Sequence, residues 1–192
     1  SSRSTMDVTI TTPQGQMQMK MIDTTRYPDY SHQEMEFMGM KIVTVSTPEG
    51  GYMSQMGQKK VLPAKEINEN RFAGFYDLLT KSDTFRIQFM KEDAIDDQPV
   101  NVLLVRDEEG SNWKKLFVNQ KTGLLMAEER LMDMMGQGKK PGRTVYGDYR
   151  TVKGIPFAHT IRIEFEGKPF MESKVTQVEV NPALDDALFK LD

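Results

Sequence analysis

Short segments in which apolar and polar residues alternate recur along almost the whole chain, and turn residues separate each segment from the next. The clearest one, FAHTIRIEFE at residues 157–166, places Phe157, His159, Ile161 and Ile163 on one side of a strand. Side chains of a strand point alternately to its two faces, so this pattern predicts a sheet with one apolar face. About eleven or twelve such segments follow one another at the spacing of antiparallel hairpins. The chain is therefore expected to be mainly β.

One segment has helical spacing instead. Residues 63–79 repeat large apolar side chains every three to five positions, and Pro63 suits the first turn of a helix. A single helix is too small to cover the apolar face of a sheet of about eleven or twelve strands. If the sheet is curved, the uncovered part becomes a concave apolar cavity.

Methionine occupies every second position of GQMQMKMID, so that Met17, Met19 and Met21 share one face of a strand. The chain contains 15 methionines, and many of them fall in its first third. The flexible thioether side chain adapts to partners of irregular shape, which favours an adaptable cavity wall, although methionine also fills irregular cores. The side chains expected to contact a ligand are Met17, Met19, Met21, Met35, Phe37, Met53, Phe85, Ile87, Phe89, Phe157, His159, Ile161 and Ile163.

Charge and composition exclude several classes of protein. The net charge of −3 argues against nucleic-acid binding, and no apolar run approaches the length of a transmembrane segment. The one basic cluster, GQGKKPGR at residues 136–143, is rich in glycine and predicts a mobile, solvated hairpin loop. The overlapping segment at residues 134–142 is a candidate lid over the cavity. Cysteine is absent, which removes disulfides, thiolate metal sites and cysteine nucleophiles.

The residues that could carry chemistry form no convincing site. His32 shares a strand face with Glu34 and Glu36, but such neighbours lie ~7 Å apart, so a charged outer face explains them more simply than a metal site. The adjacent Asp185 and Asp186 are typical of a cap or a solvated corner. No serine lies in a nucleophile elbow. We therefore expect no enzyme activity, no cofactor and no bound metal.

Several motifs resemble those of bacterial outer-membrane lipoprotein-sorting proteins, the superfamily of the LolA and LolB lipoprotein carriers. They are GDYRTVKGIPFAHTIRIEF (147–165), KVTQVEVNPALDDALF (174–189), and GLLMAEERL after NQKTG, where Asn119 takes the usual acidic position. GGYMSQMGQKKVLPAKEI resembles the small strand pair before the helix of such proteins. The resemblance is strongest over residues 113–189. It implies an unclosed half-barrel, with the helix at about residues 63–79 on its concave side, that holds the acyl chains of a lipid or lipoprotein.

The same resemblance implies a single LolA-like domain over residues 1–192 that works as a monomer in the periplasm or at the outer membrane. Residues 1–5 are interpreted as a processing or cloning remnant, and no signal sequence is visible. The expected partners are a lipid, an acylated lipoprotein or another hydrophobic ligand, with an envelope protein as a further partner. Two alternatives stay open: a Cu(I) protein that uses methionine ligands, and an accessory domain of a larger envelope protein such as an insulinase-type zinc peptidase.

Overall fold

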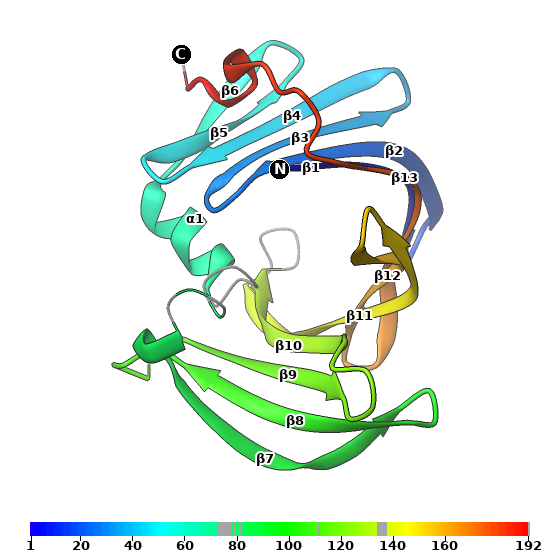
Figure 1. Cartoon of the computed structure of the whole chain (residues 1–192). Coiled ribbons are helices and arrows are strands. Elements are labelled where there is room, and N and C mark those ends of the chain that lie inside the picture. Colours follow the sequence, from blue (N-terminus) through cyan, green and yellow to red (C-terminus); the bar gives the residue numbers. More distant parts are fainter. Residues whose placement is uncertain (73–77, 79, 81, 111, 134–137, 192) are drawn as a thin grey trace.

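The structure is a computed structural model that describes residues 1–72, 78, 80, 82–110, 112–133 and 138–191. Within these residues, thirteen strands form one antiparallel sheet in the order β6-β5-β4-β3-β2-β1-β13-β12-β11-β10-β9-β8-β7. The sheet curls strongly without closing, so β6 and β7 are its two edges, and helix α1 lies at the open side of the curve (Figure 1). The prediction of a mainly β, unclosed half-barrel is confirmed. The elements are β1 (Ser2–Thr12), β2 (Gly15–Arg26), β3 (Tyr30–Phe37), β4 (Met40–Thr47), β5 (Gly50–Gln55), β6 (Gln58–Leu62), α1 (Ala64–Arg71), η1 (Ser82–Thr84), β7 (Arg86–Ile95), β8 (Gln98–Arg106), β9 (Trp113–Asn119), β10 (Leu125–Asp133), β11 (Lys139–Val152), β12 (Ile155–Phe165), β13 (Lys168–Val180) and η2 (Asp186–Phe189).

The helix starts where the sequence predicts it. The amide of Ile67 donates to the carbonyl of Pro63 over 3.2 Å, and α1 runs from Ala64 to Arg71. Of the expected remainder, residues 73–77 and 79 lie outside the described part of the chain. Ile67 is buried against β5 at Gly51, where an added Cβ would lie 2.9 Å from Ile67 Cδ1 and 2.3 Å from the Val45 carbonyl oxygen. The missing side chain of Gly51 therefore lets α1 approach the concave face of the sheet.

The second part of the basic cluster, Lys139 to Arg143, is not the loop that its composition predicts. β11 begins at Lys139, and the residues from Lys139 to Arg143 pair with β10; residues 134–137 lie outside the described part of the chain. Gly142 is buried, and a Cβ there would lie 2.8 Å from the sulfur of Met132 and 2.9 Å from Phe165. This glycine allows close packing inside a strand, a role that composition does not distinguish from a turn.

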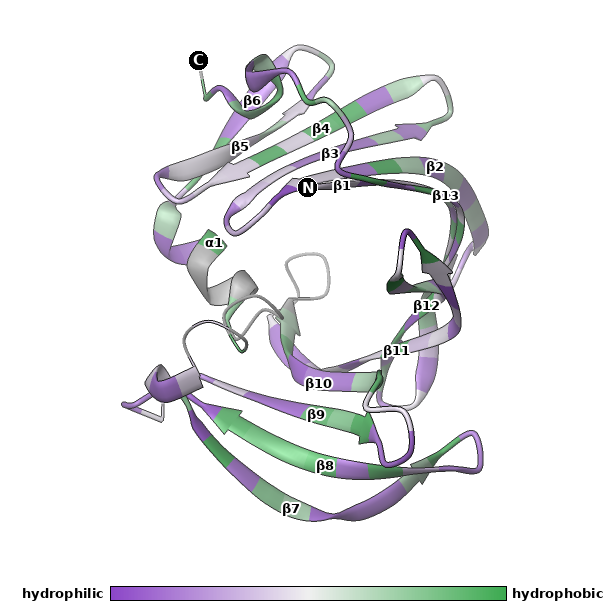
Figure 2. Cartoon of the chain, viewed as in Figure 1, coloured by the Kyte–Doolittle hydropathy of each residue, from purple (hydrophilic) through white to green (hydrophobic). Residues whose placement is uncertain are grey.

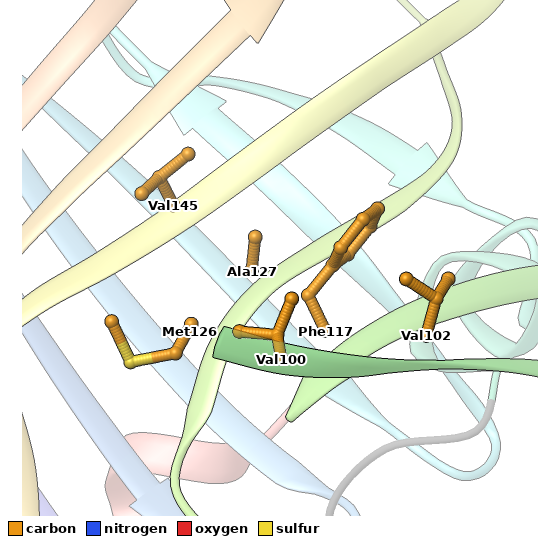
Figure 3. Close-up of a cluster of buried hydrophobic side chains, with 6 residues drawn as sticks. All are labelled: Val100, Val102, Phe117, Met126, Ala127 and Val145. Atoms are coloured by element: carbon orange, nitrogen blue, oxygen red, sulfur yellow. The ribbon is translucent and has the colours of Figure 1, made fainter. Parts of the chain in front are cut away.

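Both faces of the sheet are buried at the β8 end, so the expected division into one wet and one apolar face is wrong there. Val105 and Leu116 face the concave side, where Phe72 and Phe85 pack against them. On the outer face, a second cluster joins residues of β8, β9, β10 and β11 (Figure 3). In Figure 2, β8 is green over most of its length whereas β7 alternates, because only β8 has apolar partners on both sides. The outer cluster consists of Val100, Val102, Phe117, Met126, Ala127 and Val145.

The C-terminal segment covers the outer face of β3 and β4. Phe189 is buried and packs edge-to-face on Tyr30, with ring centroids 5.9 Å apart. The Arg26 guanidinium lies 4.4 Å from the centre of the Phe189 ring and 2.6 Å from Asp186 Oδ1. Asp185 accepts a hydrogen bond from the Ala187 amide over 2.9 Å, which confirms the prediction of a cap.

In the turn between β9 and β10, Asn119 stands where the family motif usually has an acidic residue, and its side chain makes the hydrogen bonds of the turn. The Oδ1 of Asn119 accepts hydrogen bonds from the amides of Lys121, over 3.0 Å, and Thr122, over 2.9 Å. An amide oxygen and a carboxylate oxygen are both good acceptors at such a position. The change in the motif therefore leaves the hairpin intact.

Candidate functional site

The concave side of β1 to β4 carries a continuous group of methionines. Met21 lies directly opposite Met6 of β1 and Met35 of β3 in the strand register. Met19 lies opposite Val8 in the same way, because alternate residues of each strand share a face. We call these side chains the methionine wall; its members are Met6, Met17, Met19, Met21, Met35 and Met40.

The hairpin between β1 and β2 sets this alignment. The hydroxyl of Thr12 donates to the Gly15 carbonyl over 2.9 Å and accepts from the Gln14 amide over 3.3 Å. Gly15 has a φ of 130°, a conformation that side chains disfavour. A slip of one residue would turn every methionine of β2 to the outer face, so this turn decides which face is rich in sulfur.

The methionine wall packs against a buried core, but several of its side chains keep accessible surface. Met6, Val8 and Val175 are buried, and Met19 and Met21 pack against them. Met17, Met19, Met21 and Met35 themselves are half-buried. The site therefore combines buried, packed residues with side chains that retain accessible surface.

The thirteen predicted ligand-contacting residues share the concave side but belong to three groups. The first group, on β2, β3 and β5, belongs to or adjoins the methionine wall. The second group lies on β12 and is next to β13, where Ile161 lies opposite Ser173 and Ile163 lies opposite Met171. The third lies at the β7 edge, where Ile87 is 47% and Phe89 56% exposed. The groups are Met17, Met19, Met21, Met35, Phe37 and Met53; Phe157, His159, Ile161 and Ile163; and Phe85, Ile87 and Phe89.

His159 is buried on the concave side, and one of its ring nitrogens lies 3.0 Å from the Phe157 carbonyl oxygen. This contact holds the ring against its own strand. His159 thus has the partner that a buried imidazole requires.

Some residues of the concave face were missing from the predicted site. Met6, Val8 and Ile10 of β1 and Met171 of β13 pack with the predicted residues. The alternation in MDVTI was a usable signal for the β1 residues. Met171 owes its position to the pairing of β13 with β1, which no local pattern reveals.

Charged groups interrupt the apolar surface between the β12 and β7 groups. Lys114 Nζ lies 3.1 Å from Glu128 Oε2, and Arg130 Nε lies 3.7 Å from the other oxygen of the same carboxylate. Burial and the nearby Glu128 carboxylate raise the pKa of Tyr146 well above its usual range, so its hydroxyl stays protonated. Charged side chains therefore separate the β7 edge of the concave face from the β12 group and the methionine wall.

The outer face is polar where it backs the methionine wall. A cavity of about 850 Å³ there is lined by charged side chains that include Asp7, Lys20 and Glu36. Glu34 pairs with Lys41 over 2.6 Å and lies 3.8 Å from His32, which is buried. Within the described part of the chain, no three His, Cys, Asp or Glu side chains are placed to hold a metal ion.

The fold and the concave face together define an open antiparallel half-barrel with an apolar inner wall. Three solved structures share this architecture, and each match covers 98% of this chain. They are an outer membrane lipoprotein-sorting protein domain from Vibrio parahaemolyticus (TM-score 0.65, 14% identity, 88% of that chain), a DUF1329 family protein from Desulfovibrio piger (0.65, 13%, 89%) and a LolA superfamily protein from Nitrosomonas europaea (0.66, 14%, 89%).

The chain therefore has the LolA-like fold that its motifs indicated. No protein-family model matches the chain, and no curated protein sequence matches it. Among the described residues, no helix combines the length and hydrophobicity needed to cross a bilayer.

Proposed function

We propose that this protein is a non-catalytic carrier of the bacterial cell envelope that binds the acyl chains of a lipid or an acylated lipoprotein on its concave face. The observation that carries the proposal is the alignment of methionines from β1, β2 and β3 into one half-buried wall. Its fold is shared with a lipoprotein-sorting domain, which supports the same class of ligand.

The mechanism is reversible burial without the making or breaking of covalent bonds. Each ligand methylene that leaves water contributes about 0.8 kcal/mol, so a chain that is only partly sheltered still binds usefully. Methionine side chains rotate more freely than branched ones and follow the contour of an acyl chain. The methionine side chains pack against the buried residues Met6, Val8 and Val175.

Native mass spectrometry tests this proposal. The protein is purified from a bacterial envelope fraction without detergent, and any bound species is extracted with solvent. The wild type is expected to carry a lipid or acylated species. Substitution of Met17, Met19 and Met21 by Gln is expected to remove it, because three amides cannot replace the apolar contacts.

The matched control is the variant Met56→Gln. This methionine lies at the turn between β5 and β6 with 79% of its surface exposed, and neither of these strands carries a member of the methionine wall. The control is expected to keep the bound species. A wild-type protein that carries nothing, with no uptake of added lipid, would contradict the carrier proposal and favour an accessory interaction domain.

A second candidate function uses the same residues. Met6, Met21 and Met35 lie side by side on three adjacent strands, and thioethers are the soft ligands that select Cu(I). Anaerobic titration with Cu(I) against a chromophoric chelator distinguishes the two functions. Stoichiometric binding that is lost in Met21→Leu would support copper handling, since leucine keeps the apolar volume but removes the sulfur.

A further inference from the structure

The concave side of β1 to β4 changes from apolar to polar along one line that crosses all four strands. On each of the four strands, the last apolar side chain of the concave face is followed, two positions along the strand, by a polar side chain on the same face. On β2, for example, Met21 is followed by Asp23, and on β3 Met35 is preceded by Gln33. We call this row of polar side chains the polar band; it consists of Ser4, Asp23, Gln33 and Thr44.

The strand register shows that the polar band is one continuous row. Ser4 lies opposite Asp23, Asp23 opposite Gln33, and Gln33 opposite Thr44. Facing side chains of neighbouring strands are close enough to contact one ligand group together. The next row is polar as well, with Thr25 opposite both Ser2 and Ser31.

Asp23 carries the charge of the polar band. Its carboxylate accepts a hydrogen bond from the Thr25 hydroxyl over 3.3 Å, and Gln33 is a second side-chain partner. Burial is the larger influence and raises the pKa of this carboxyl, while the two hydrogen bonds and the nearby His32 oppose it. A carboxyl that loses hydration in this way gains from a cationic or hydrogen-bond-donating partner.

The arrangement gives the concave face a direction. The methionine wall lies toward the turn between β1 and β2, and the polar band lies toward the turn between β2 and β3. A pocket that is mostly apolar with a few convergent polar groups binds a ligand in one orientation. An amphiphile fits this face with its chain on the methionines and its polar end at Asp23.

We propose that the polar band binds the head group of an amphiphile that bears a primary ammonium, whose hydrocarbon chain lies along the methionine wall. This inference rests on the proposed carrier function and names the chemical class of its ligand. The ammonium donates hydrogen bonds to the Asp23 carboxylate, and the side-chain oxygens of Gln33 and Thr44 accept from its remaining N–H groups.

Three probes of equal chain length test the head group separately from the chain: dodecylammonium, dodecanol and dodecanoate, each below its micelle concentration. The wild type is expected to bind dodecylammonium about tenfold more tightly than dodecanol, and dodecanoate more weakly than either, by isothermal titration calorimetry. In Asp23→Asn the preference for the ammonium is expected to disappear while dodecanol binding is unchanged.

Two further variants separate the parts of the site. Asp7→Asn removes a carboxylate from the outer face of β1, and it is expected to keep the wild-type preference. Met21→Gln is expected to weaken all three probes by a similar factor, because it changes the wall and leaves the polar band intact. Thermal unfolding of each variant confirms that it is folded at the temperature of the titration.

The outcomes distinguish the two proposals. Equal affinities for the three probes, or an ammonium preference that survives in Asp23→Asn, would overturn the polar band as a head-group site and leave chain binding in place. Failure of every probe to bind the folded wild type would overturn the carrier function itself.

Discussion

Met6 and Met21 lie directly opposite each other in the β1–β2 pair, and both point to the concave side of the sheet. Met6 is 6% exposed, so the wall rests on a buried base at this point, while Met21 keeps part of its surface accessible. One pair thus joins the hydrophobic core to the candidate binding surface.

Met21→Gln is expected to weaken the binding of an uncharged long-chain probe by about tenfold, because it places an amide in the centre of the methionine wall. Fluorescence titration with dodecanol as competitor measures the change. Met56→Gln, at an exposed turn, is the control and is expected to bind as the wild type does. Equal weakening in both variants would argue against a role of the wall.

Phe117→Ala is expected to lower the free energy of unfolding by about 3–5 kcal/mol, since it leaves a cavity in the outer cluster. Urea denaturation measures the loss. Probe binding per folded molecule is expected to stay unchanged, because Phe117 lies on the opposite face of the sheet from the wall. The paired variant Phe89→Ala alters a 56% exposed side chain and is expected to change stability by less than about 1 kcal/mol.

Gly51→Ala is expected to destabilise the protein by about 2–3 kcal/mol and to release α1 from β5. The added Cβ would meet the Val45 carbonyl at 2.3 Å and Ile67 Cδ1 at 2.9 Å, and the backbone group cannot move aside easily. Hydrogen exchange at the Ile67 amide reports on the helix. Gly147→Ala is the matched control, because its Cβ would meet Thr160 Oγ1 at 3.3 Å and nothing closer.

Stability is expected to fall as the pH drops below 6.5, the ordinary pKa of histidine, partly through His32. Burial lowers the pKa of His32 in the folded protein, and the neighbouring Glu34 only partly offsets this. Between the lowered folded pKa and 6.5, the unfolded chain binds more protons than the native state, so acid favours unfolding.

His32→Gln is expected to flatten the stability curve in that window, as measured by urea denaturation at a series of pH values. An unchanged slope would show that His32 ionises equally in both states.

The local pattern determined much of the fold. His32, Glu34 and Glu36 share one strand face in β3, and α1 begins next to Pro63 as expected. The alternation of FAHTIRIEFE also identified which side chains of β12 face inward. These features are readable because the period of two and the helical period depend on neighbouring residues alone.

Elsewhere, the same reading failed for a physical reason. The glycines and the proline of GQGKKPGR suggested a loop, but Lys139 to Arg143 form part of β11, because pairing with β10 and β12 outweighs local propensity. The outer cluster around Phe117 was also missed. A strand that is buried on both faces requires partners on both, and those partners come from β9, β10 and β11.

The sequence by itself determined that methionines share one face of a strand and that the chain folds mainly as β-sheet. Only the tertiary structure decided that Met6, Met21 and Met35 stand side by side, and that Ser4, Asp23, Gln33 and Thr44 form a row next to them. Register depends on hydrogen bonds between strands and on the turns that join them. A one-residue shift would scatter both rows while leaving each strand's own pattern unchanged.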